Sequence, residues 1–145
     1  MYIGKEQINM RKHFFQHNWV KEHLEGIDEE DLDEMQRIGI LKAHTDMVSK
    51  LPEGASLQGS SNRTHNEIWT IGDRVFAMQS SPELNVQYIK DLVIMKLYDI
   101  GKLDDTQMNL CLEQLLEEMI PISRHFMLKC IYSFIKTPNN YAIKL

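Results

Sequence analysis

The sequence has few of the features that assign a chain to an export or membrane class. It contains only two cysteines in 145 residues, and residues 1–15 have neither an apolar signal core nor a small-residue cleavage site. No apolar run approaches the roughly 20 residues that span a bilayer. We therefore expect a cytoplasmic protein with no membrane contact, in which Cys111 and Cys130 are buried free thiols.

Basic residues are also scarce relative to acidic ones. Sixteen Lys and Arg face twenty-one Asp and Glu, for a net charge of −5. This balance argues against broad binding to a phosphate backbone, so no direct nucleic-acid partner is expected. Hydrophobic residues make up 43% of the chain and charged residues 26%, which fits a single globular domain over residues 1–145.

The spacing of apolar residues predicts a mainly α (α+β) fold, a bundle of about five helices. The central helix is expected at 81–101, where Ser81 caps the start, Pro82 takes the first position and Gly101 ends the helix. Its apolar side chains point in nearly every direction, so we expect it to be covered on several sides. The other helices are predicted at 5–24, 28–50, 102–120 and 121–136.

One β-hairpin is predicted at 67–79, between the second and third helices. Gly72 and Asp73 suit a two-residue turn, which places Trp69 opposite Phe76. Before the hairpin, residues 52–66 are rich in Gly, Ser and Asn and are expected to form a flexible loop. Residues 139–145 are expected to be a tail.

A cluster of acidic side chains surrounds the start of the second predicted helix. Negative charge at a helix N-terminus is favourable, and Asp28 is the candidate cap, so the cluster fits a solvated helix start. The alternative is a surface that binds a partner with a basic face. The residues assigned to that surface are Glu25, Asp28, Glu29, Glu30, Asp33 and Glu34.

The last predicted helix is apolar over most of its circumference. Phe126 and Phe134 belong to its apolar part, and Lys129 lies on a narrow polar stripe. That stripe fits the solvent side of a buried helix. The excess apolar surface favours an interface instead, either with a protein partner or in a homodimer through residues 105–136.

Two small groups of residues are candidates for chemistry. His13 and His17 are four apart on a predicted helix, so they are either exposed histidines or half of a metal site. Arg63 and His65, close to Glu67, lie in the predicted loop and are either flexible polar residues or part of a ligand site.

No glycine-rich phosphate loop or nucleophile elbow is present. We therefore expect a small soluble regulatory or adaptor protein that binds another protein, performs no catalysis and needs no cofactor. The alternative is a small ligand- or metal-binding domain, or an enzyme, with its site near 62–69 or at His13 and His17.

Overall fold

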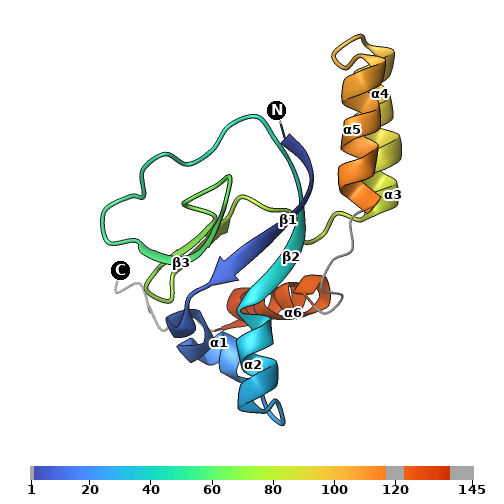
Figure 1. The fold of residues 1–145 in the computed structure, drawn as a ribbon. Helices are drawn as coiled ribbons and strands as arrows, with labels where there is room; N and C mark the ends of the chain where they lie inside the picture. Colours follow the sequence, from blue (N-terminus) through green and yellow to red (C-terminus); the bar gives the residue numbers. More distant parts are fainter. Residues whose placement is uncertain (1, 117–122, 138–145) are drawn as a thin grey trace.

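A five-stranded antiparallel sheet organises the protein, rather than a bundle of helices. The computed structural model describes residues 2–116 and 123–137. The strand order is β2-β1-β3-β4-β5 (Figure 1). The strands are β1 (Tyr2–Met10), β2 (Arg37–His44), β3 (Ser56–Ser61), β4 (Ile68–Ile71) and β5 (Val75–Met78).

The sheet curves into a half-barrel. The chain that leaves β5 returns to β2, where the backbone N–H of Ser81 donates a hydrogen bond of 3.1 Å to the carbonyl of Leu41. Gly59 of β3 lies against β1, and a Cβ at this position would come within 2.9 Å of the Met10 sulfur and 3.0 Å of Ile8. A larger residue would therefore separate β3 from the side chains of β1.

The helices form two groups (Figure 1). The first group comprises the 3₁₀ helix η1 (Lys12–Gln16), α1 (Asn18–Lys21) and α2 (Glu29–Met35), joined by α6 (Ser123–Lys136) from the other end of the chain. The second group consists of a continuous helix, divided into α3 (Val86–Tyr88), a π-helical segment η2 (Ile89–Ile94) and α4 (Met95–Asp99), paired with α5 (Asp105–Leu116). No helix in either described range is long and apolar enough to cross a membrane.

Two hydrophobic clusters occupy the two faces of the β1–β2 pair. Ile40 belongs to one and Leu41 to the other, because successive residues of a strand point to opposite faces. The inner cluster is rich in aromatic residues and contains Phe14, Phe15, Trp19, Val20, Ile38, Ile40, Ile68, Phe126 and Met127, among others. The outer cluster is centred on Ile3, Leu41, Ile89, Ile94, Leu103 and Leu115.

The predicted helical bundle is therefore wrong. Residues 5–24 were expected to form one helix, but Lys5 to Met10 belong to β1, and two short helices follow. Residues 28–50 contain the short helix α2 and then the strand β2, which pairs with β1 over eight residue pairs. Long-range pairing overrode the helical spacing, since propensity is only a weak prior against tertiary contacts.

The hairpin is confirmed, but its register is not. Ile71 pairs with Val75 across a three-residue turn, so Thr70 rather than Trp69 lies opposite Phe76. Gly72 in this turn has a φ of +50°, which glycine adopts without strain. Residues 52–66 also differ from expectation, because Ser56–Ser61 form β3.

The predicted central helix is shorter and less covered than expected. It begins after Asn85, whose side chain accepts a hydrogen bond from the Tyr88 N–H, and Gly101 ends it with a φ of +68°. Ile89 and Ile94 are buried, but Leu92 is 56% exposed. Asp104 caps α5 through a reciprocal pair of hydrogen bonds with Gln107. Residues 139–145 lie outside the described ranges.

Candidate functional site

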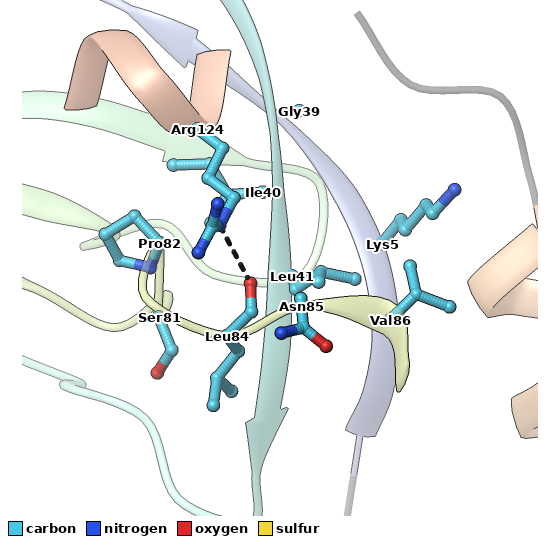
Figure 2. A pocket seen from close by; sticks show the side chains of 10 residues that line it. All are labelled: Lys5, Gly39, Ile40, Leu41, Ser81, Pro82, Leu84, Asn85, Val86 and Arg124. Carbon is cyan, nitrogen blue, oxygen red and sulfur yellow. Dashed lines mark hydrogen bonds between the residues drawn. The ribbon is translucent and has the colours of Figure 1, made fainter. Parts of the chain in front are cut away.

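A cavity of about 260 Å³ lies where β2, the segment after β5 and the start of α6 meet (Figure 2). Three features of the chain build it: the middle of β2, residues 81–86, and one long side chain from each of β1 and α6. The lining residues are Lys5, Gly39, Ile40, Leu41, Ser81, Pro82, Leu84, Asn85, Val86 and Arg124.

Arg124 holds the segment after β5 against α6. Its Nε donates to the Leu84 carbonyl at 3.2 Å, the bond drawn in Figure 2, and its Nη2 donates to the Glu83 carbonyl at 3.1 Å. Pro82 is buried, and the Ser81 N–H is bonded to β2. These contacts fix residues 81–84 at both ends, so the wall of the cavity is preformed.

The charge of the cavity favours an anionic group. Its only charged lining residues are the cations Lys5 and Arg124, on either side of the β2 ribbon in Figure 2, and the rest of the lining is largely apolar. Fixed cations beside a low-dielectric wall attract anions more strongly than they would in open water. The cavity is therefore suited to a small molecule with a carboxylate and an apolar or methylene portion.

Neither thiol is prepared for nucleophilic attack. Burial, followed by the charge of Glu22, raises the pKa of Cys130 to about 12. Burial also raises the pKa of Cys111. Because the thiolate is the reactive form, both thiols are poor nucleophiles at neutral pH.

A buried charged cluster at the end of the half-barrel ties three strands to one turn. The Lys42 ammonium has no exposed surface and bonds to Glu67 and, at 2.6 Å, to Glu6. It also bonds to Ser61 at 3.2 Å and Thr64 at 3.3 Å. These bonds join side chains from β1, β2 and β3 to the 61–67 segment, so this cluster is suited to structural support.

The residues of the predicted acidic surface lie around α2 and its approach. Asp28 caps α2 as expected, accepting a bond of 2.9 Å from the Asp31 N–H. Asp33 lies 4.0 Å from Lys12. The side chains of Glu25, Glu30 and Glu34 are exposed, and Glu29 begins the helix. None of these residues lines the cavity at Arg124.

The aromatic residues assigned to a C-terminal interface lie in or against the inner cluster. Phe126 is 7% exposed and stacks on Phe15, with ring centroids 6.4 Å apart. Phe134 packs edge-on against Trp19 at 5.3 Å. Lys129 is exposed on α6. Both aromatic rings therefore stabilise the core of this chain.

The polar candidates lie in separate places: His13 and His17 line one cavity, whereas Arg63 and His65 do not. His13 and His17 lie in and directly after η1, near Ser56 and Asp73 respectively. The Arg63 guanidinium covers the ring of Tyr2 at 4.5 Å, and His65 is exposed. Within the described residues, no three His, Cys, Asp or Glu side chains are grouped to hold a metal ion.

The sequence reasoning missed Arg124 and Lys42. Arg124 fell within the predicted helix 121–136 and was given no role, and Lys42 was expected in a helix that is in fact β2. Their roles depend on contacts 40 and 25 residues away along the chain, to Leu84 and Glu67. Such contacts join residues far apart along the chain, so neighbouring residues in the sequence do not predict them. Glu67 was noted only because it is close to Arg63 and His65.

Comparison with known proteins relates the chain to enzymes. No family model matches it. Gamma-glutamyl peptidase 3 of Arabidopsis thaliana is 36% identical over 63 residues, which are 43% of this chain and 25% of that protein. The chain thus spans about a quarter of the length of the curated relative it matches.

Two solved structures share the fold. SMU.1228c superposes with a TM-score of 0.60 and 16% identity, covering 92% of this chain and 52% of that one. A glutamine amidotransferase from Thermotoga maritima superposes with a TM-score of 0.59 and 17% identity, covering 93% of this chain and 51% of that one. This chain therefore corresponds to about half of each structure.

These likenesses overturn the expectation of a non-catalytic regulator or adaptor. The sequence match is to a peptidase and the fold match includes an amidotransferase, so the prediction that the chain is not an enzyme is wrong. The alternative prediction, a ligand-binding domain or enzyme, agrees better with both findings. The positions proposed for that site, 62–69 and His13 with His17, stay predictions.

Proposed function

We propose that this chain forms part of an enzyme that cleaves or transfers γ-glutamyl amide groups. The observation that carries the proposal is the sequence likeness to a γ-glutamyl peptidase, since a shared fold alone does not imply a shared function. The structural likeness to a glutamine amidotransferase over 93% of the chain agrees with it. Glutamine and γ-glutamyl peptides have in common an amide at the end of a glutamyl side chain.

The cavity bounded by Arg124 and residues 81–86 is the proposed binding site for the glutamyl group. A glutamyl group offers an α-carboxylate and a short methylene chain. In this proposal the carboxylate lies toward Arg124, whose guanidinium geometry matches a carboxylate. The methylenes lie against the apolar wall that Ile40, Leu84 and Val86 contribute.

Amide cleavage also needs a nucleophile for the carbonyl carbon and an acid to protonate the leaving amine. The lining of the cavity contains no Cys or His, and the two thiols of the described residues have raised pKa values. We therefore propose that the attacking group comes from a part of the enzyme outside the described residues. In that assembly this chain binds and orients the substrate.

The free state of both thiols supports a cytoplasmic location for this enzyme. Reducing compartments keep such thiols unpaired, and the cytoplasm is the proposed site of action.

The proposal is tested by comparing two isomeric substrates. The tagged chain would be purified from its native host with whatever it assembles, and release of para-nitroaniline measured from γ-glutamyl- and α-glutamyl-para-nitroanilide. We expect release from the γ-isomer alone, reduced in Arg124→Ala and retained in Lys129→Ala, a matched change on the same helix. Equal release from both isomers, or none from the γ-isomer, would contradict the proposal.

A further inference from the structure

Helix α6 packs one side against the inner cluster and leaves the opposite side exposed. Phe126, Met127 and Cys130 are buried in that cluster. On the other side, residues spaced by four, three and four positions share one face of the helix, and all are exposed. We call this surface the α6 face, and it consists of His125, Lys129, Tyr132 and Lys136, with Ile135 at its edge.

The α6 face combines apolar surface with positive charge. Tyr132 is 58% and Ile135 74% exposed, and the Lys136 ammonium lies 4.2 Å from the centroid of the Tyr132 ring. The helix contains no Asp or Glu. Neither Lys129 nor Lys136 forms an ion pair with a residue in the ranges 2–116 and 123–137. This composition favours contact with an acidic protein surface.

The same group of helices carries a surface of the opposite charge, around α2 (Figure 1). Residues 22–36 contain eight Asp and Glu side chains and no Lys or Arg. Among the described residues, their one ion pair with a lysine or arginine joins Asp33 to Lys12, at 4.0 Å between two highly exposed side chains. Glu30 and Glu34 are exposed. The chain thus presents an acidic surface and a basic face that do not neutralise each other through ion pairs.

We propose that a second copy of this chain covers the α6 face with its acidic surface, forming a two-fold dimer. In a two-fold interface each copy contributes both surfaces, so the contact between the α6 face and the acidic surface forms twice. Opposite charges then lie across both contacts, and Tyr132 and Ile135 are removed from water. The dimer does not depend on the proposed γ-glutamyl chemistry.

Sedimentation velocity of the purified chain at increasing concentration measures this dimer directly. We expect a monomer–dimer equilibrium at low salt. Its dissociation constant should rise at least about tenfold between about 0.05 and 0.5 M NaCl, because salt screens the charges that join the two copies. A monomer at every concentration in low salt would overturn the dimer, and a dimer that salt does not weaken would overturn the charged interface.

Charge reversal on each surface tests which parts of the two copies meet. The basic reversal combines Lys129→Glu with Lys136→Glu, and the acidic reversal combines Glu30→Lys with Glu34→Lys. Each should weaken self-association at least about tenfold, because like charges then face each other. All four positions are exposed, so we expect both variants to fold. An equimolar mixture of the two variants should associate again, because both contacts then join opposite charges.

A matched reversal on the outer helices, Lys90→Glu with Lys96→Glu, is the control and should leave self-association unchanged. Thermal melting verifies that each variant folds like the parent. A mixture that stays monomeric would show that a second copy is not the occupant of the α6 face. Unchanged association in both reversals would show that the interface lies elsewhere. If a variant fails to fold, the salt titration of the parent chain still decides the proposal.

Discussion

The inner and outer hydrophobic clusters lie on opposite faces of β1 and β2 and differ in the residues that form them. The inner cluster holds Phe14, Trp19 and Met127 at 2% exposure or less. The helices over the outer cluster leave Leu92 56%, Ile100 62% and Leu116 77% exposed. On the inner side α6 also leaves Tyr132 58% and Ile135 74% exposed, so the clearer difference is that aromatic rings dominate the inner cluster and aliphatic side chains the buried outer one.

This chain corresponds to about half of each solved neighbour, and its described residues bury the aromatic inner cluster. We expect the inner cluster to determine the stability of this chain and the outer cluster to contribute less. The following predictions test that expectation, from the largest expected effect to the smallest.

Removing one inner aromatic ring should have the largest effect. Phe14 has no exposed surface and contacts the rings of Phe15, Trp19 and Phe76. Phe14→Ala should lower the free energy of unfolding by about 4 kcal/mol. Leu97→Ala, a partly buried residue of the outer cluster, should lower it by about 2 kcal/mol or less. Urea denaturation measures both, and equal losses would break the distinction between the clusters.

A substitution in the buried charged cluster around Lys42 should have the next largest effect on stability. Lys42→Met leaves Glu6 and Glu67 close together without their shared cation, which should cost about 3 kcal/mol at neutral pH. Lys129→Met, at an exposed position on α6, is the control and should change stability little. Thermal melting compares the two variants. If Lys42→Met is as stable as the parent, the cluster does not hold the turn at 61–67.

The cap of α5 should have a smaller effect. Asp104→Ala removes the acceptor for the Gln107 N–H and should cost about 1 kcal/mol, confined to the outer helices. Hydrogen exchange measured amide by amide should become faster in α5 and stay unchanged in β1 and β2. Faster exchange throughout the sheet would mean that the outer helices and the inner cluster unfold as one unit.

The reactivity of the two thiols compares the two clusters without a substitution in either core. Cys111, partly buried beside the outer cluster, should react with a thiol reagent before Cys130, which is buried in the inner cluster. The folded chain keeps the Cys130 proton up to about pH 12, whereas the unfolded thiol loses it near pH 9. Stability should therefore be complete below about pH 9 and fall as the pH rises further, and Cys130→Ala should reduce that fall. Equal labelling rates would contradict this view of the two clusters.

Local signals in the sequence predicted local features. Asp28 and Gly101 lie at helix ends as expected, and Gly72 lies in the turn of the hairpin. These features depend on the capping atom or backbone angle of one residue, so the sequence displays them directly.

The sheet and the cavity could not be predicted in the same way. Ile8 and Ile38 read equally well as helical apolar positions, and only their pairing across 30 residues makes them strand residues. Arg124 defines the cavity by donating to the backbone carbonyls of residues 83 and 84. Residues of any type have such carbonyls, so the sequence gives no sign of these contacts. A protein partner with a basic surface and a homodimer stay untested predictions.

The central claim is that the cavity at Arg124 accepts a glutamyl group. Its most direct test is NMR titration of the chain with L-glutamine, with Arg124→Ala and Lys129→Ala as matched variants. The account predicts saturable shifts at Gly39, Leu41 and residues 81–86 that are lost in Arg124→Ala and kept in Lys129→Ala. Absence of binding by the parent chain, or equal binding by both variants, would contradict it.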